Sequence, residues 1–558
     1  MAAEARRRFG LLTLGRRYFG FLVAVAVTVV AVLYIPPISG NSSANSRSTG
    51  NLSSNTGSTS RGSTQFGNPQ GELTPSIYGS SSGLNSKANG AKTVDGTPCL
   101  AGARQVDWSK YAPLCLAAYH ANNGGATSPG VTGSTITITY REATTSEEQA
   151  LYSSVAPSVV GSNASVVATM NQYIKVFNRS FELYGRHVVL KPFSGQGDFL
   201  QEDEGFDQVQ AQADAITAHS IGAFGDVSIL ASTQPYDQSL ASEHVISIGA
   251  IAMPQSWFAG LAPYAYSPWA DCNKSALTSA IVIGKAMAGM PAIYAGDPLL
   301  QSKLRDFGVV YPQIPTYSGC ARQAVQQAES QYGVQFNPQD IDPLQLDLSS
   351  LSQQASIIVA RWKQDGVTSV LCACDPLSPI YLAAAADAQN YHPEWFSFSF
   401  GDAFGRLPSQ DQWAHAISGG FQSLPKDQQE AYQVYKMVDP KGTPDPSYYY
   451  IYAPLLQLFD ALQAAGPNLN PKTFEAGMEA LPTSLPGGMY GQWVFGKNVY
   501  DPPNSFGITW WDPQSVSVQD NKKGSWNSCN SGRSYLVSDG ASTLPVHTQL
   551  ACFGFSPP

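Results

Sequence analysis

The chain has 558 residues, a formal net charge of −9 and a charged fraction of only 13%. Its length is sufficient for two or three domains. The acidic balance provides no positive field for nucleic acid, which is therefore not expected as a partner.

A basic and then apolar segment begins the chain. Arginines precede the uncharged run from Tyr18 to Ile35, and two prolines follow it. Those 18 residues would rise about 27 Å as a helix, close to the thickness of a bilayer core. Because the arginines lie on one side only, we expect a cytoplasmic segment at 1–17, a single-pass signal anchor in the cell membrane at 18–35 and an extracellular remainder. A cleaved signal peptide is the alternative, and the remainder would then be secreted.

A polar, low-complexity segment separates this anchor from the folded part. Residues 36–95 are rich in Ser, Asn and Gly, a composition that cannot bury enough apolar surface to fold, so we expect a disordered tether. Its GSSSG sequence at 79–83 matches the pattern of a nucleophile elbow. That elbow must lie between a strand and a helix, and neither is predicted here. A small disulfide-stapled collar is expected at 96–133.

The eight cysteines of an exported chain are expected to form disulfides. Two pairs are close enough in sequence to be local staples, namely Cys99 with Cys115 and Cys529 with Cys552. The remaining four are expected to pair among themselves in an order that the sequence leaves open: Cys272, Cys320, Cys372 and Cys374. No Cys-x-x-Cys motif or histidine cluster accompanies them, so no metal site is expected.

From residue 134 the sequence alternates strand and helix patterns. The run TITITY at 135–140 is β-branched and alternating, and apolar residues at helical spacing follow it between Val166 and Phe177. A second strand is predicted at 185–193. Two later strands, at 292–295 and 367–371, run into Asp-Pro dipeptides suited to helix starts. This alternation predicts an α/β fold with parallel sheets flanked by helices, whose sites lie at the carboxyl ends of the strands.

Six stretches occur in the order typical of one family. They are GVTGSTITIT at the start, NQYIKVFN followed by YGRHVVL, ILASTQPYDQSLASEHVISIG, AIYAGDPLLQSKLRDFG, VTSVLCACDPLSPIYLAAAADAQNY and GGMYGQWVFGKN. Over residues 134–510 the chain therefore resembles the type I periplasmic solute-binding proteins, the branched-chain amino acid receptor family of ABC importers. The collar that ends in NNGGATSPGVTG is similar to that of exported actinobacterial members.

The resemblance implies a two-lobed fold with solute held in the cleft between the lobes. Each lobe would be a parallel sheet flanked by helices, and closure of such lobes is a hinge motion. Lobe 1 is expected at 134–268 and 425–490, and lobe 2 at 269–424 and 491–558. Three crossing strands would join the lobes near 266–272, 420–425 and 488–495.

In lobe 1, the resemblance assigns the ligand's carboxylate to Ser232, Thr233 and Gln234. Hydroxyls and free backbone N–H groups at a helix start are suitable anion donors. The alternative is that one of the hydroxyls only caps the following helix. Thr144, in the loop after the opening strand, is a second candidate, with an ordinary polar loop as the alternative.

In lobe 2, the candidates are Asp375 and Ser378 at the head of the DPLSP helix, and Asp402. Asp402 stands where the family carries the acid that pairs with a ligand's amino group, since a desolvated ammonium needs such a partner. The alternatives are a helix cap for Asp375 and a loop acid for Asp402. One departure weakens amino-acid specificity, because Pro298-Leu299 occurs where many amino-acid binders have an aromatic residue. Aromatic walls, or simply core, are expected from Trp395, Tyr236 and Trp413.

The resemblance thus implies a membrane-tethered receptor that closes on a small polar solute, amino-acid-like or an amide, and delivers it to an ABC permease. A ligand sensor or orphan binding module with the same fold is the alternative. An enzyme is less favoured, because the seven histidines are scattered and no local catalytic or metal signature occurs. No cofactor is expected.

Overall fold

The structure is a computed structural model that describes residues 90–100, 102–145, 159–347, 349–398, 401–485 and 487–554. These residues belong to one compact unit of the chain. The expected anchor at 18–35, the GSSSG motif and most of the expected tether lie outside the described residues. Within the described part, none of the helices combines the length and apolar character that a membrane span requires.

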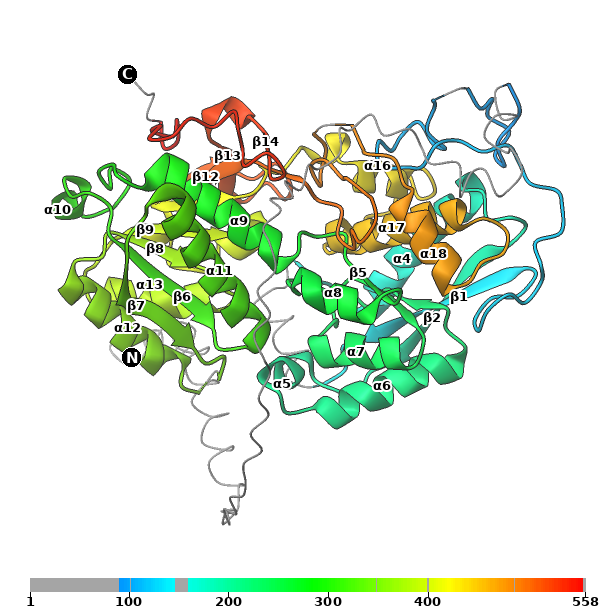
Figure 1. Cartoon of the computed structure of the whole chain (residues 1–558), viewed down its shortest axis with the longest axis horizontal. Coiled ribbons are helices and arrows are strands. Elements are labelled where there is room, and N and C mark those ends of the chain that lie inside the picture. The colour runs from blue at the N-terminus through cyan, green and yellow to red at the C-terminus, as the bar shows by residue number, and fades with distance from the viewer. Residues whose placement is uncertain are drawn as a thin grey trace, which may run out of the picture. The chain divides into compact units, whose positions relative to one another are not determined.

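The first lobe is built on a five-stranded parallel sheet in the order β2-β1-β3-β4-β5. Figure 1 shows β1, β2 and β5 in this lobe and β6 to β9 in the other. Its strands are β1 Thr135–Glu142, β2 His187–Ser194, β3 Gly225–Asp226, β4 Ile246–Ile248 and β5 Ala265–Tyr266. The predicted run TITITY forms β1, where Ile138 is opposite Leu190 of β2 and Gly225 of β3. Its alternation places Ile136, Ile138 and Tyr140 in the core. The two strands predicted first are therefore confirmed.

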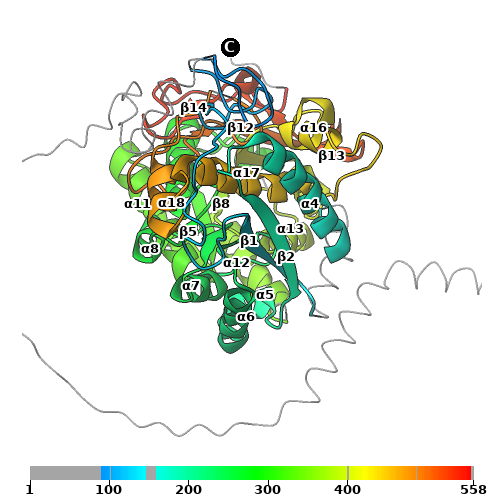
Figure 2. The same ribbon diagram turned by 90° about the vertical axis from the view of Figure 1, so that its right-hand side faces the viewer.

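Helices cover both sides of this sheet, as the view onto the first lobe shows (Figure 2). They are α4 Asn163–Ser180, α5 Phe199–Glu204, α6 Gln208–Ile221, α7 Gln234–Ser242, α8 Gln255–Leu261, α16 Glu430–Lys436, α17 Tyr448–Ala465 and α18 Pro471–Glu479. The predicted apolar face of α4 is buried, and its Phe177 ring lies 5.1 Å from the ring of Phe459 on α17. Phe177 and Phe459 are 282 residues apart in sequence, yet they share one core.

The second lobe is built on a seven-stranded sheet in the order β13-β12-β10-β9-β8-β6-β7. Its strands are β6 Phe307–Pro312, β7 Phe336–Leu344, β8 Ser369–Cys372, β9 Glu394–Phe398, β10 Ala416–Gly419, β12 Ile508–Val516 and β13 Lys523–Ser528. The strands from β7 to β10 are parallel, whereas β12 and β13 join antiparallel at one edge. A separate antiparallel pair consists of β11 Ser505–Phe506 and β14 Tyr535–Leu536. The sheet is therefore mixed at the edge that the C-terminal segment supplies.

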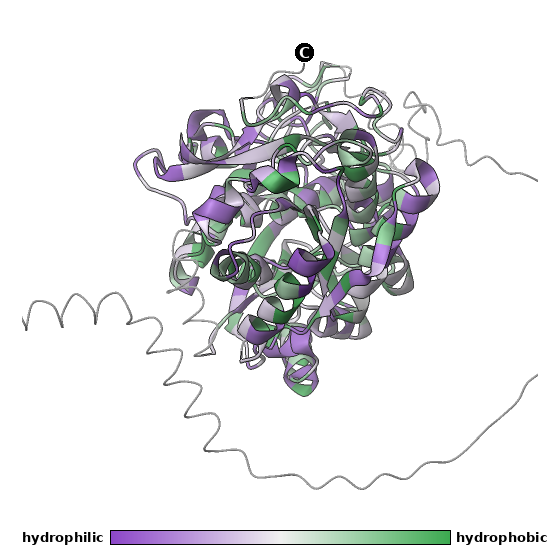
Figure 3. Cartoon of the chain, turned by 90° about the vertical axis from the view of Figure 1, so that its left-hand side faces the viewer, coloured by the Kyte–Doolittle hydropathy of each residue, from purple (hydrophilic) through white to green (hydrophobic). Residues whose placement is uncertain are grey.

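The helices of the second lobe place their hydrophilic stretches outward, while hydrophobic stretches follow the strands between them (Figure 3). They are α9 Cys272–Val282 with the π-helical extension η1 Ile283–Met287, α10 Pro298–Gln301, α11 Pro315–Tyr332, α12 Leu351–Asp365, α13 Ser378–Ala388, α14 Asp402–Gly405 and α15 Gln410–Trp413. Short 3-10 turns occur at η2 Lys426–Gln428 and η3 Asn530–Gly532. Amphipathic helices of this kind bury one face against a sheet and leave the other in water.

One predicted strand is wrong. Residues 292–295 form a buried turn closed by a hydrogen bond from the Ala295 N–H to the Ala292 carbonyl oxygen. The Tyr294 N–H donates instead to the Glu394 side chain, 3.0 Å away. The β6 strand lies further along the chain, at Phe307–Pro312. The first Asp-Pro signal is confirmed, since Asp297 caps α10 by accepting from the Leu299 N–H. The second, Asp375-Pro376, lies before its helix, which begins at Ser378 with Leu377 as the N-cap.

Three passages connect the lobes, and hydrogen bonds join them to one another. The first is 267–271, the second is 420–425, and the third runs between Tyr500, in the first core, and Phe506, in the second. The Ser267 N–H donates to the Tyr500 carbonyl oxygen, and the Gly420 N–H donates to that of Gly507. The third passage therefore lies after the range 488–495 expected for it, where Tyr490 and Trp493 are buried in the first core.

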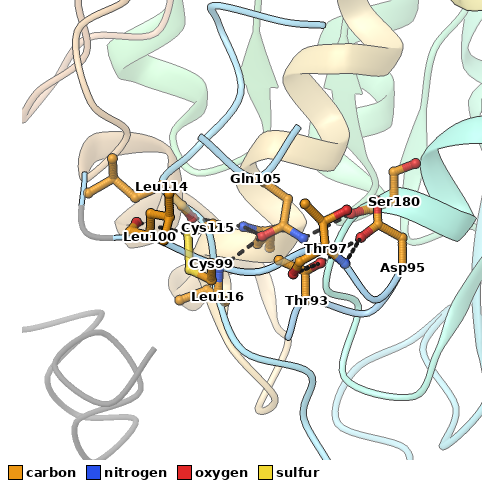
Figure 4. The surroundings of a disulfide bond; sticks show 11 residues. Thr93, Asp95, Thr97, Cys99, Leu100, Gln105, Leu114, Cys115, Leu116 and Ser180 are labelled. Carbon is orange, nitrogen blue, oxygen red and sulfur yellow. Dashed lines mark hydrogen bonds between the residues drawn. A yellow bond between two sulfur atoms is a disulfide. The ribbon is translucent and has the colours of Figure 1, made fainter. Parts of the chain in front are cut away.

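The collar is stapled and anchored to the first lobe (Figure 4). Cys99 and Cys115 form a disulfide, and the Gln105 side chain donates to the Ser180 carbonyl oxygen at the end of α4. Tyr111 is fully buried, with its ring 4.5 Å from that of Trp493. Residues before the opening strand thus contribute to the core of lobe 1.

Four disulfides are present and no described cysteine is free. They are Cys99–Cys115, Cys272–Cys320, Cys372–Cys374 and Cys529–Cys552. The two pairs that the sequence favoured are confirmed. Of the two it left open, one joins α9 to α11 and the other closes a loop at the end of β8.

Candidate solute cleft

A cavity of about 1360 Å³ lies where the strand ends of both lobes meet. In the first lobe it is lined by the segments that follow β3 and β4, and in the second by those that follow β8 and β10. The carboxyl ends of parallel strands leave such a crevice because the chain turns away there toward opposite faces of the sheet. A smaller cavity of about 680 Å³ adjoins it and shares Asp203, Gln234 and Tyr317.

The loop before α7 contributes Ser232, Thr233 and Gln234 to the cavity wall. Ser232 donates its hydroxyl hydrogen to Asp237, 2.7 Å away, and Thr233 donates its own to Glu202. Thr233 also caps α7 by accepting from the Tyr236 N–H. Both hydroxyl groups therefore already donate their hydrogens to carboxylates, and toward a ligand these side chains can act only as hydrogen-bond acceptors.

A buried ion network fixes this loop from behind. Arg141 donates to Glu202 at 2.7 Å and to Asp214 at 3.2 Å, and it also contacts the Ala231 carbonyl oxygen. Its guanidinium lies 4.0 Å over the ring of Tyr236. Because all of these partners are buried protein groups, Arg141 orders the loop and is not presented to the cavity.

In the second lobe, the loop after β8 contributes Asp375 to the cavity. Its carboxylate accepts from the N–H groups of Leu377 at 2.7 Å and Ser378 at 3.0 Å, and from the Ser378 hydroxyl. The N-cap residue of α13 is Leu377, so Asp375 is not the cap itself, but it satisfies the N–H groups of that residue and of the first helical residue. Burial nevertheless raises the pKa of this carboxyl, against the lowering effect of those hydrogen bonds. Ser378 is fully buried behind Asp375 and does not line the cavity.

Asp402 borders the cavity, but its carboxylate already accepts hydrogen bonds from two protein groups. One carboxylate oxygen accepts from the Ser517 hydroxyl at 2.6 Å, and the other accepts from the Trp526 N–H at 3.0 Å. The side chain is only 1% exposed. These bonds join α14 to the C-terminal strands, so the arrangement is that of a structural acid and not of an open ammonium site.

Thr144 lies apart from the other predicted residues. Its hydroxyl donates to the Gly195 carbonyl oxygen at 2.6 Å, and the residue does not line the cavity. The structure therefore brings together Ser232, Thr233, Gln234 and Asp375, with Asp402 at the margin, and separates Thr144 from them.

An acidic residue that the sequence did not single out faces Asp375 from the opposite lobe. Asp203 of α5 is exposed to the cavity, and its carboxylate makes no hydrogen bond or ion pair with any residue that the structure describes. Although it is accessible, desolvation by the surrounding cleft walls, and then the negative charges of Glu202, Asp237 and Asp375, raise its pKa to about 7. Tyr317 of α11 lies close enough to Asp203 and Asp375 that, after burial, their negative charges also raise the pKa of its phenol. Two carboxylates and a phenol from different lobes thus meet in one cavity.

Aromatic side chains form much of the remaining wall. Trp269, in the first passage, packs with its ring 5.5 Å from those of Tyr449 and Tyr490. Further rings in the wall include Phe199, Phe398, Phe404, Phe421 and Tyr432. The three aromatic residues suggested as walls by the sequence are core instead, since Trp395, Tyr236 and Trp413 are buried and do not line the cavity.

Comparison with known proteins decides the fold. No family model and no curated protein matches the sequence. The fatty acid ABC transporter substrate-binding protein of Thermomonospora curvata is 14% identical, and the match covers 75% of this chain and 97% of that one with a TM-score of 0.52. The leucine-, isoleucine-, valine-, threonine- and alanine-binding protein of Brucella ovis is 12% identical over 76% and 99%, with a TM-score of 0.51. An ABC transporter substrate-binding protein of Aeropyrum pernix is 11% identical over 73% and 99%, with a TM-score of 0.50.

The chain has the type I periplasmic-binding-protein fold.

In this type I fold, the residues that sequence reasoning missed are those whose place depends on distant contacts. Asp203 belongs to a short helix with no motif, and Tyr317 becomes part of the site only because α11 borders the cleft. One local signal was available. The run YYYIY begins at Tyr448 on a helix, where consecutive residues face in different directions, so some of those rings must leave the core.

Proposed function

We propose that this chain is an exported solute receptor that binds one small molecule between its lobes and closes on it. The observation that carries the proposal is the large cavity lined by strand-end loops of both lobes. A ligand in contact with both lobes stabilises the closed arrangement, because it gains contacts there that the open arrangement lacks. The three bonded passages supply the hinge for such a motion.

The proposal assigns the protein a binding role and no catalysis. The neighbours of known structure are named as ABC transporter substrate-binding proteins, so delivery of the solute to an ABC permease is the form of the proposal that they support. Retention in the membrane by residues 18–35, with the folded unit outside the cell, is part of the same proposal. It rests on the arginines and the apolar run of the sequence.

The amino-acid-like ligand first expected has less support than the receptor role itself. Its carboxylate would be held at 232–234 and its ammonium at Asp402. Asp402, however, already has two protein donors, and the hydroxyls of Ser232 and Thr233 already serve Asp237 and Glu202. Support for this ligand therefore rests on the resemblance alone.

The test is native mass spectrometry of the full-length chain purified without denaturation, followed by small-angle scattering with the co-purified solute. We expect a bound solute of defined mass and a smaller radius of gyration when the protein is saturated. A protein that binds its solute with no change in radius of gyration contradicts the closing mechanism. If no solute from the cell's medium binds at all, the receptor role is wrong.

A further inference from the structure

We propose that the solute is an amphipathic cation, with a bulky apolar or aromatic body held by the aromatic wall and an ammonium head placed against Asp203, where the negative charge of Asp375 in the same cavity adds to the attraction. This inference deepens the receptor function proposed above and rests on it. It differs from the amino-acid-like solute in two respects, because the body is larger and no free carboxylate is needed.

The first argument is size and surface. Pockets for small ligands are usually about 300–1,000 Å³, and this cavity is about 1360 Å³. In the cleft as the structure has it, an amino acid would leave most of the aromatic wall in contact with water. Rings from both lobes and from the first passage face the space, among them Trp269, Phe404, Phe421, Tyr432, Tyr449 and Tyr490. A large apolar body would remove that surface from water, which is the main driving force of such binding.

The second argument is the balance of charge. The described residues that line the cavity include six acids, namely Asp203, Glu204, Asp237, Asp375, Asp402 and Asp520, against the lysines 274, 426 and 522, and no arginine. Lys274 is paired with Asp501 at 2.8 Å, and Lys426 lies 5.9 Å over the ring of Tyr432. Among the acids, Asp520 is paired with Arg406, and protein groups donate to Asp237, Asp375 and Asp402. Of the six lining acids Asp203 alone is exposed, so a ligand carboxylate near it would meet an open acid, and Lys522 is the lining lysine that stays exposed near Asp520. The first turn of α7 already holds an acid of its own, Asp237.

The third argument is the direction of the hydrogen bonds. Ser232 and Thr233 donate inward to Asp237 and Glu202, so their oxygens can only accept from a ligand. Asp203 has no partner among the described residues and is likewise an acceptor. The polar groups at this end of the cavity are therefore hydrogen-bond acceptors that need a donor, and an ammonium group provides three N–H donors. Aromatic faces add a favourable cation–π contribution.

Closure strengthens the argument. Asp203 and Asp375 belong to opposite lobes, so bringing the lobes together concentrates two negative charges in a space that loses water. Like charges in such a site repel strongly unless a proton or a cation neutralises them. An ammonium ligand would remove this repulsion and would thereby couple its own binding to closure.

The test uses three probes with one carbon skeleton: 4-phenylbutylamine, 4-phenylbutan-1-ol and 4-phenylbutanoate. Each is titrated calorimetrically into the full-length chain in detergent at about pH 8, where Asp203 is charged, and titrations into detergent alone are subtracted. We expect the amine to bind about tenfold or more tightly than the carboxylate, with the alcohol between them, as a charge-assisted contact predicts. Tightest binding of the carboxylate overturns the proposal, and so does failure of all three to bind.

Variants locate the head group. Asp203→Asn should weaken binding of the amine about tenfold and change that of the alcohol less than about twofold, because only the charge is removed. Asp203 has no protein partner to lose, so this variant avoids the folding risk of Asp375→Asn. Glu329→Gln, on the exposed side of α11, is the matched control and should change neither. Equal losses for amine and alcohol in Asp203→Asn would refute the ammonium assignment.

Failure of this inference is distinguishable from failure of the receptor role. If a co-purified solute compacts the protein but lacks a cationic nitrogen or an apolar body, only the ligand class is wrong. If neither a co-purified solute nor any probe compacts the protein, the receptor role itself is wrong.

Discussion

The disulfide Cys372–Cys374 should contribute little to the free energy of unfolding of the protein but much to the affinity of the cleft for its ligand. Its two cysteines are two residues apart in sequence, whereas those of Cys529–Cys552 are 23 apart. Loop-closure entropy predicts about 1.6 kcal/mol from a loop of about three residues and about 3.4 kcal/mol from one of about 24. All four cysteines are buried to a similar degree, at 0–4% exposure, so the cavities left by alanine should be comparable.

The perturbation is therefore a matched pair of double variants, Cys372→Ala with Cys374→Ala and Cys529→Ala with Cys552→Ala. Urea denaturation of the full-length chain should show the second variant to be less stable by about 2 kcal/mol. The affinity for 4-phenylbutylamine should show the reverse order, with the Cys372 and Cys374 double variant the more strongly impaired. Ala373 and Cys374 line the cavity from within the disulfide loop, and Asp375 lines it directly after that loop. Releasing the loop should therefore weaken binding of the amine about tenfold or more.

Two results would refute this reasoning. Equal losses of stability would mean that loop size does not govern these disulfides. Unchanged affinity in the Cys372 and Cys374 variant would mean that the loop holds Asp375 in place without its cross-link, through its hydrogen bonds with the N–H groups at the start of α13 alone.

The affinity for 4-phenylbutylamine should rise between about pH 6 and pH 8 in calorimetry. Desolvation by the cleft walls and the charges of Glu202, Asp237 and Asp375, opposed by Arg141, raise the pKa of Asp203 to about 7, so the carboxyl is mostly neutral below that pH and mostly charged above it. The amine, like a lysine, stays charged throughout, and a flat or falling profile would contradict the assignment. Asp402→Ala should lower the free energy of unfolding by about 1–3 kcal/mol, because buried donors lose their acceptor, yet change the amine's Kd less than about twofold. A tenfold loss of affinity for the amine in Asp402→Ala would instead show that Asp402 binds the ligand. Protease added outside intact cells should release the folded unit if 18–35 is a retained anchor, whereas mature protein already free in the medium would indicate a cleaved signal peptide.

Local sequence predicted the fold where the physical cause is local. The β-branched alternation of β1 and the helical spacing of α4 depend on the residues themselves and on one buried face. Residues 292–295 show the limit of this reasoning. They are apolar and buried like a strand, but the Tyr294 N–H finds its acceptor in Glu394, 100 residues away, so the segment turns instead. No local pattern contains that partner.

The site divides in the same way. Ser232 and Asp375 were predictable as cavity residues, because both follow strands whose carboxyl ends topology brings to one edge. What their atoms do was not predictable, since Ser232 donates to Asp237 and Asp402 is held by Ser517 and Trp526 only in the folded chain. Asp203 and Trp269 enter the cavity wall through tertiary contacts that no spacing in the sequence reports.

The bonded passages limit how the cleft can change its width. The Gly420 N–H donates to the Gly507 carbonyl oxygen at 2.9 Å, and a Cβ atom on Gly507 would lie 2.7 Å from the carbonyl oxygen of Gly420. The Ser267–Tyr500 bond joins two passages at the first lobe, and the Gly420–Gly507 bond joins two at the second, where it continues the β10–β12 pairing. Because passages are joined at both lobes, they should bend together when the lobes swing. New ligand preferences can then arise by exchange of wall residues while these joined passages stay unaltered.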